Sequence, residues 1–170
     1  MGLSEATGRA IEILRANRYT ALATQDAGGP WVAVVGHIAM APDKLYFVSR
    51  HVSRHGTAVR AEPRVAGVIY DSTVELDKAD GIQFAGLCRE TEANDALLRR
   101  FLDRAADQLA DSVEEELAAF HANDEFRLYE ITVTTAYVLD QQAWAEEGID
   151  SREDVDVATL FAAVESDFAA

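Results

Sequence analysis

The segment SRHVSRHGTAVRAEPRVAG, residues 49–67, gathers hydroxyl, guanidinium and imidazole groups in a chain that is otherwise strongly acidic. Residues 54–62 are predicted to form a short helix, and Pro63 ends it because the residue before a proline is pushed out of the α region. The free N–H groups of a helix start, together with cationic and hydroxyl donors, favour a doubly negative phosphate. We therefore expect a phosphate cradle at this helix start, built from Ser49, Ser53, Arg54 and His55.

Two other interpretations of this segment remain open. In the first, the segment only caps a surface helix, and Arg50 and Arg54 pair with some of the many carboxylates, which contributes little to stability. In the second, His51 and His55 share a helix face at a spacing of four residues and bind a metal. That interpretation is weaker because the chain has no His-Glu-x-x-His pattern and no evident third ligand, so we expect no metal site.

Upstream of this segment, the pattern predicts one helix and three strands. Residues 4–17 carry apolar side chains at helical spacing, and Ser4 can cap the helix start. Residues 19–26, YTALATQD, and residues 31–40, WVAVVGHIAM, flank the turn AGGP and form a hairpin. A second turn, APD, places residues 44–49, KLYFVS, antiparallel to the preceding segment. We expect these three strands to form an antiparallel meander.

Downstream, three further strands are expected. The β-branched residues of 64–71, RVAGVIYD, fit a buried strand, and residues 81–92, GIQFAGLCRETE, resume the strand pattern after a polar loop. Gly81 and Gly86 are expected points of a bulge or a close approach. Residues 126–140, FRLYEITVTTAYVLD, alternate cleanly and form the last long strand.

The remaining segments are helical. Residues 94–122 form a helical insertion, expected as two helices that break near Asp111. About six strands with one insertion suit a small closed barrel, because ring closure removes exposed edges. We expect one domain over residues 1–142, which includes the insertion, and an acidic C-terminal tail over 143–170 that ends in a helix.

Composition narrows the possible functions. With 170 residues and a net charge of −15, the chain suits one soluble domain, and its field disfavours nucleic acid and anionic membranes as partners. No apolar run approaches a membrane span, and the start lacks a secretory signal, so we expect a cytoplasmic protein. Cys88 stands alone in an apolar stretch and is expected to be a small buried hydrophobe.

The segment SRHGTAVRAEPRVAGVI, residues 53–69, resembles the phosphate-binding signature of the pyridoxamine 5'-phosphate oxidase-like FMN-binding split-barrel superfamily. Members of that superfamily carry Ser-Arg-Lys, a short helix, and Asn-Pro-Arg before an apolar strand. The matching residues here are Ser53, Arg54, Pro63 and Arg64. With the hairpin and the later strands, the resemblance covers residues 8–142. It implies a mainly β fold with flanking helices, a six-stranded antiparallel Greek-key split barrel.

The resemblance also implies FMN at the interface of a homodimer, with each site built from both subunits. Ser53, Arg54 and His55 would hold the phosphate, and Val48 and Ser49 would line the same cleft. The residues expected beside the flavin ring are Val34, Val35 and Gly36 by their backbone, and Gln83 from the partner subunit.

The chain departs from the oxidase itself at several positions. His55 stands where the superfamily usually has Lys, and a neutral imidazole carries no charge for the phosphate. Val32 and His37 lie near places where the oxidase has Arg and Lys, and the tail lacks its arginine-bearing substrate segment. The small-molecule substrate is therefore not expected to be pyridoxamine phosphate.

Three functions remain as hypotheses. The first is an FMN-dependent oxidoreductase with hydride transfer at flavin N5 and no assigned catalytic residue. The second uses the deazaflavin F420, whose longer acidic tail would need further cations such as Arg50 and Arg60. The third is a non-enzymatic flavin- or haem-binding dimer, and its possible haem ligands are His51, His55 and His121. Two smaller alternatives concern His37, as a general acid or a hydrogen-bonding strand residue, and Trp144, as a cofactor cover or a barrel plug.

Overall fold

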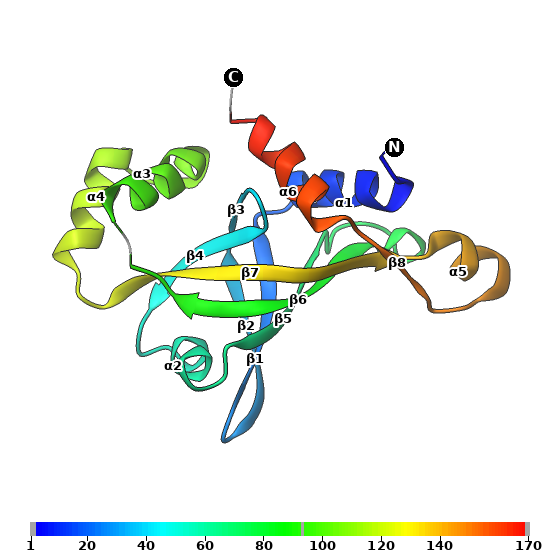
Figure 1. The fold of residues 1–170 in the computed structure, drawn as a ribbon, viewed down its shortest axis with the longest axis horizontal. Helices are drawn as coiled ribbons and strands as arrows, with labels where there is room; N and C mark the ends of the chain where they lie inside the picture. Colours follow the sequence, from blue (N-terminus) through cyan, green and yellow to red (C-terminus); the bar gives the residue numbers. More distant parts are fainter. Residues whose placement is uncertain (1–2, 93, 169–170) are drawn as a thin grey trace.

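The protein is built on one curved antiparallel sheet, which the computed structural model describes within residues 3–92 and 94–168 (Figure 1). In these residues the sheet has eight strands in the order β2-β1-β5-β6-β7-β4-β3, and β8 pairs with β7. The strands are β1 (Tyr19–Asp26), β2 (Gly29–Gly36), β3 (Ile38–Met40), β4 (Lys44–Arg50), β5 (Arg64–Tyr70), β6 (Gly81–Glu90), β7 (Phe126–Leu139) and β8 (Arg152–Asp154). The helices are α1 (Glu5–Ala16), α2 (Arg54–Ala61), α3 (Asp95–Arg104), α4 (Val113–Ala122), α5 (Gln141–Glu147) and α6 (Val157–Ser166), with short 3-10 turns at Leu76–Lys78 and Ala106–Gln108.

The two ends of this sheet lie together because of the chain connection between them. β2 and β3 stand at opposite ends of the strand order, but only His37 separates them in sequence. Consecutive Cα atoms are about 3.8 Å apart, so the sheet must curl until its ends meet. In the described residues no ladder joins β2 to β3, so the barrel stays open there. The mainly β split barrel is confirmed, whereas the expectation of a fully closed ring is wrong.

The expected count of six strands is corrected as well. Residues 31–40 form two strands rather than one, because the His37 N–H donates to Arg18 O at 3.0 Å and the following residues pair with β4. The tail adds β8, which pairs with residues 137–139 of β7. The turn APD places β4 antiparallel to residues 38–40 as predicted, but the three-strand meander is wrong, because residues 29–36 pair with β1 and not with β4. Alternating apolar residues identify a strand but do not choose its partner.

Most local predictions are confirmed. β1 and β2 form the expected hairpin over their whole length, and residues 94–122 hold the two helices α3 and α4. Ser4 caps α1 by accepting from the Thr7 N–H. The register of β6 against β7 shifts between Ala85 and Gly86, which confirms the expected bulge.

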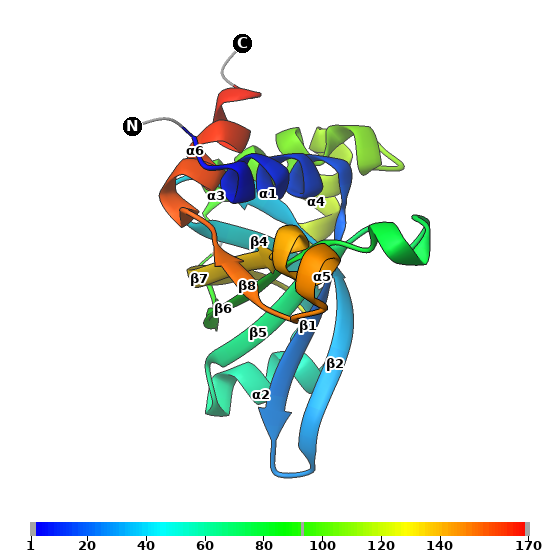
Figure 2. The same cartoon turned by 90° about the vertical axis from the view of Figure 1, so that its right-hand side faces the viewer.

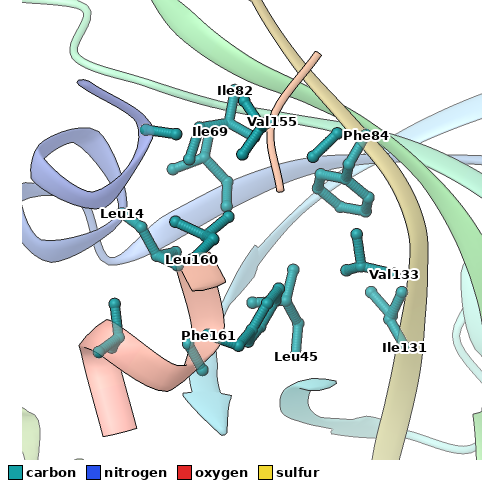
Figure 3. Close-up of a cluster of buried hydrophobic side chains, with 14 of the residues drawn as sticks. Leu14, Leu45, Ile69, Ile82, Phe84, Ile131, Val133, Val155, Leu160 and Phe161 are labelled. Carbon is teal, nitrogen blue, oxygen red and sulfur yellow. The ribbon is translucent and has the colours of Figure 1, made fainter. Parts of the chain in front are cut away.

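A first apolar cluster fills the inner side of the sheet, and α1 and α6 cover it (Figures 2 and 3). The helix from the tail contributes Leu160 and Phe161 to this cluster, each 2% exposed. Cys88 also lies in the cluster and is buried as expected, and burial raises the pKa of its thiol to about 12. The labelled members in Figure 3 are Leu14, Leu45, Ile69, Ile82, Phe84, Ile131, Val133, Val155, Leu160 and Phe161.

A second apolar cluster lies on the other side of β3, β4 and β7, where α3 and α4 cover it (Figure 1). Its buried members are Ile38, Met40, Tyr46, Leu98, Phe101, Leu102, Ala105 and Leu128. β4 therefore has apolar packing on both faces, which fixes the strand that leads into α2. Among the described helices, none combines the length and the apolar character needed to cross a membrane.

Candidate functional site

The start of α2 lies at the end of β4, beside the hairpin of β1 and β2 (Figure 1). Ser53 is the N-cap, and its Oγ accepts from the Gly56 N–H at 3.1 Å. A Cβ added to Gly56 would lie 2.6 Å from the Tyr129 hydroxyl and 2.9 Å from Ser53 Oγ. Glycine at this position therefore lets the first turn of α2 seat directly on Tyr129.

The Tyr129 hydroxyl is buried and has no hydrogen-bond partner among the described residues. Its ring stacks on Phe47 of β4 at a centroid distance of 5.0 Å. Buried hydroxyls nearly always have a partner, so the Tyr129 hydroxyl is a polar group that the described residues leave unsatisfied beside the α2 start.

His55 turns back toward β4. Its Nε2 lies 2.8 Å from Ser49 Oγ and 3.2 Å from Ser53 Oγ, so the three polar side chains form one connected group. Partial burial lowers the pKa of the His55 ring below its ordinary value of 6.5, which keeps the ring neutral at pH 7. The group therefore offers hydrogen bonds to a phosphate but no positive charge.

Arg54 extends the other way, to the tip of the β1–β2 hairpin. Its Nε and Nη2 donate to the two carboxylate oxygens of Asp26, at 2.6 and 3.0 Å. Its guanidinium carbon lies 4.5 Å from the centroid of the Trp31 ring. The one cation of the predicted cradle is thus paired with a carboxylate.

The neighbouring arginines are paired too. Arg50 lies 2.7 Å from Glu125, and Arg60 donates to His51 O at 3.0 Å and lies 3.5 Å from Glu90. The interpretation of Arg50 and Arg54 as partners of carboxylates therefore describes their contacts, and these contacts are mostly exposed. The F420 alternative would need Arg50 and Arg60 to leave these partners.

Val48 and Ser49 lie on opposite faces of β4, as consecutive strand residues must. Ser49 contacts His55, whereas Val48 packs against the second apolar cluster. The structure therefore does not bring Val48 to the Ser49 side.

The three residues predicted beside the flavin ring lie at the end of β2. Val34 is 72% exposed on the outer side of the sheet, and Val35 is buried in the first apolar cluster. Gly36 is exposed, and an added Cβ would meet only ordinary contacts. Because β2 ends the strand order and pairs with β1 alone in the described sheet, one edge of its backbone is open.

Gln83 lies elsewhere, in the wall of a hollow of about 690 Å3 between β5, β6 and α5. Its Oε1 accepts from Arg152 Nε of β8 at 2.7 Å. The ring of Trp144 from α5 lines the same hollow and is 52% exposed, so it does not plug the barrel. Sequence reasoning missed Arg152, since no local pattern in the tail connects it to Gln83.

His37 is buried, and its Nδ1 lies 2.9 Å from Thr20 Oγ1 within the sheet. This geometry agrees with the hydrogen-bonding role rather than with a general acid. Burial lowers the pKa of His37 to about 4.

The buried His37 ring predicts a stability that depends on pH. Because the folded pKa of about 4 lies below the ordinary 6.5, the contribution is complete above pH 6.5 and is lost as pH falls toward 4. Between pH 7 and pH 4.5 the loss is about 2.5 kcal/mol. Denaturant unfolding at both pH values measures this loss of unfolding free energy in the wild type. In His37→Gln the loss between the two pH values should be smaller by that amount. An NMR titration that finds the His37 pKa near 6.5 would contradict the expectation.

Among the described residues, no three His, Cys, Asp or Glu side chains gather in a way that could hold a metal ion. His51 lies on the connector before α2, and His121 lies far along the chain in α4, 3.1 Å from Asp95. His121 lines a hollow of about 640 Å3 beside Phe120 and Phe126, whereas the His55 ring turns to Ser49 of β4.

The sequence did not indicate Asp26 and Trp31 as neighbours of the cradle. They lie in a hairpin more than twenty residues before Arg54, and only the position of α2 beside that hairpin brings them together (Figure 1). The one available signal is the turn AGGP, which places Asp26 and Trp31 at the same hairpin tip.

Several solved structures share this fold at low sequence identity. HutZ, a haem storage protein from Vibrio cholerae, has a TM-score of 0.62 and 16% identity, covering 76% of this chain and 91% of its own. A haem-binding protein from Mycobacterium smegmatis has a TM-score of 0.67 and 17% identity, with coverages of 95% and 62%. General Stress Protein 26 from Bacillus anthracis has a TM-score of 0.58 and 19% identity, with coverages of 79% and 93%.

Among curated proteins, no sequence matches the chain. The family model described as pyridoxamine 5'-phosphate oxidase matches residues 7–140, which run from α1 through the end of β7. The match includes α2 and β5, whose residues and flanks carry the signature from Ser53 to Arg64. The chain therefore belongs to the pyridoxamine 5'-phosphate oxidase family.

Proposed function

We propose that this protein is a homodimeric FMN-binding oxidoreductase. The observation that carries the proposal is the group at the α2 start, in which two hydroxyls and an imidazole lie beside free helix N–H groups, with the Arg54 guanidinium on the same helical turn. This donor set fits a phosphate monoester, and the unpaired Tyr129 hydroxyl next to it fits a site for a polar ligand. The Asp26 carboxylate, which pairs with Arg54, opposes an anion there.

The outer side of the sheet supports a dimer. Residues directly opposite one another on paired strands share a face, and two rows cross β2, β1, β5 and β6 in this way. The rows are Val34, Ala21, Val68 and Gln83, then Val32, Ala23, Ala66 and Ala85. Val34 and Val32 are 72% and 58% exposed. A mostly apolar face of small side chains suits a second copy of the same face.

The same rows support the assignment of Gln83 to the partner's site. Three strand spacings, about 14 Å, separate Gln83 from Val34 within one protomer. Face-to-face packing about a two-fold axis would bring the Gln83 of one copy toward the Val34 edge of the other. The flavin ring would then lie between the open edge of β2 and the partner's hollow.

When bound, FMN supplies hydride transfer at its N5. Ser49, Ser53, Arg54 and His55 would anchor its phosphate, and the backbone of residues 34–36 would orient its ring. The apolar face would exclude water from the ring. No side chain is assigned as an acid or a base.

A haem-binding dimer is the second candidate, because two proteins of the same fold are described as haem-binding or haem-storing. It has less support than FMN, because the His55 ring is engaged with Ser49 and Ser53 and His121 lies 3.1 Å from Asp95.

Absorbance and mass spectrometry of the purified protein test the proposal, followed by FMN titration of Arg54→Ala. Loss of one charge-assisted phosphate contact is expected to weaken FMN binding about 30-fold, which is about 2 kcal/mol. Arg99→Ala, on the exposed surface of α3, serves as the control and should bind FMN as the wild type does. Bound haem, or undiminished FMN affinity in Arg54→Ala, would overturn the assignment.

A further inference from the structure

Asp26 occupies the part of Arg54 that a phosphate would use. A guanidinium presents its donors as a fork that matches a carboxylate or a phosphate through two parallel bonds. The two Asp26 oxygens accept from Nε and Nη2 of Arg54, at 2.6 and 3.0 Å. The side chains are 39% and 26% exposed, so a ligand from solvent can reach this pair.

Other contacts at the hairpin tip hold Asp26 in this position. The Gly28 N–H donates to Asp26 Oδ1 at 2.7 Å, and the Trp31 ring lies under the guanidinium at 4.5 Å. A Cβ added to Gly28 would lie 3.0 Å from Arg54 Nη2, so the tip fits closely around the cation. The hairpin tip therefore closes on Arg54 through an anion, a backbone segment and an aromatic face.

The local charge is close to zero as a result. Arg54 contributes one positive charge and Asp26 removes it, while His55 is neutral at pH 7. The whole chain carries a net charge of −15. A dianionic phosphate facing Arg54 would lie against the Asp26 carboxylate without a surplus of positive charge.

We propose that Asp26 is an internal competitor for the phosphate site, so that a phosphate-bearing ligand must displace its carboxylate from Arg54. This inference rests on the proposed function and concerns how tightly the ligand is held. Competition by a built-in anion makes the flavin an exchangeable ligand rather than a permanently bound group. It also couples ligand entry to the hairpin tip, because Arg54 leaves the Trp31 ring when it turns to the phosphate.

Calorimetric titration of wild type, Asp26→Asn and Arg54→Ala with FMN, riboflavin and inorganic phosphate tests the competition. Asp26→Asn keeps the size of the side chain but removes its charge, so the Kd of FMN and of phosphate is expected to fall about ten-fold. Riboflavin, which has no phosphate, should bind wild type and Asp26→Asn equally. The gain should shrink at high salt because exposed charges are screened. The matched control is Asp71→Asn, an exposed loop aspartate hydrogen-bonded to Thr73.

The outcomes separate this inference from the proposed function. If Arg54→Ala weakens FMN binding but Asp26→Asn leaves it unchanged or weaker, Asp26 is no competitor and the cradle still stands. If neither substitution changes FMN affinity, the phosphate site itself is wrong, and the inference falls with it.

A second readout follows the position of Arg54 and needs no comparison of affinities between variants. The chain has two tryptophans, so Trp144→Phe leaves Trp31 as the only one. Saturating inorganic phosphate should change the Trp31 emission in the Trp144→Phe protein, and the change should be absent once Arg54→Ala is added. Unchanged Trp31 emission at saturating phosphate would overturn the displacement of Arg54 from its ring.

Discussion

A Gly86→Val variant is expected to lose about 3 kcal/mol or more of unfolding free energy, because the bulge between β6 and β7 leaves no room for a side chain. A Cβ at residue 86 would lie 2.4 Å from the Thr132 carbonyl oxygen and 3.2 Å from Ile131 Cγ2. The first neighbour is backbone in the central ladder, so it cannot rotate away as a side-chain end would. The sheet must open locally to accept the new atoms.

Urea or guanidinium unfolding followed by circular dichroism measures this loss. Gly8→Ala in α1 is the matched control, since an added Cβ there meets only Leu3 Cδ2 at 3.7 Å. An alanine in a helix interior is expected to raise stability by about 0.5–1 kcal/mol relative to glycine. A Gly86→Val protein as stable as the wild type would show that the bulge does not constrain this position.

A Glu165→Ala variant is expected to lose about 3 kcal/mol at pH 7, because it leaves the buried Arg104 without its partner. The Arg104 guanidinium from α3 contacts Glu165 of α6, and Arg104 Nη1 also donates to Ala39 O at 3.2 Å. The second Glu165 oxygen accepts from the Ala41 N–H at 3.0 Å. One carboxylate thus joins the tail helix to both the helical insertion and the turn that follows β3.

The same carboxylate gives a pH signature with a definite sign. Hydrogen bonding to Arg104 lowers the Glu165 pKa to about 2, from an ordinary 4.5. The stabilisation is therefore complete well above pH 4.5 and is lost as pH falls toward 2. The difference between wild type and Glu165→Ala should narrow from about 3 kcal/mol at pH 7 to about 1 kcal/mol at pH 3.

Two further variants identify the cause of the loss. Asp107→Ala breaks an exposed pair with Arg18 and should cost less than about 0.5 kcal/mol. Adding Arg104→Met to Glu165→Ala removes the unpaired buried charge and should restore part of the stability. An equal loss of unfolding free energy in Glu165→Ala and Asp107→Ala, independent of pH, would contradict the buried-charge argument.

The parts of the fold that the sequence predicts best depend on contacts close along the chain. The helix after Ser53, its end at Pro63, the β1–β2 hairpin and the bulge at Gly86 all follow from local backbone preferences. The apolar pattern of residues 31–40 predicts a single strand because it continues through His37, while the break there depends on a bond to Arg18.

The candidate site divides along the same line. Ser49, Ser53 and His55 meet as expected, since the turn between β4 and α2 keeps them within a few residues of one another. The partner of Arg54 was not predictable, because Asp26 comes from a hairpin that only the packing of α2 brings near. The side chains of Val48 and Ser49 point to opposite faces of β4, because consecutive strand residues alternate. Helices distant in sequence, α3 and α4, cover the face that carries Val48.

The sequence by itself determined the family, through the signature from Ser53 to Arg64 and the order of strands around it. Those features are local, and each segment encodes its own backbone geometry and periodicity. Only the tertiary structure decided that the sheet curls to an open barrel, that α6 closes the first apolar cluster, and that Asp26 neutralises Arg54. These outcomes depend on contacts between segments far apart in sequence. The energy of such a contact depends on both elements together, so it cannot be read from the local sequence of either one.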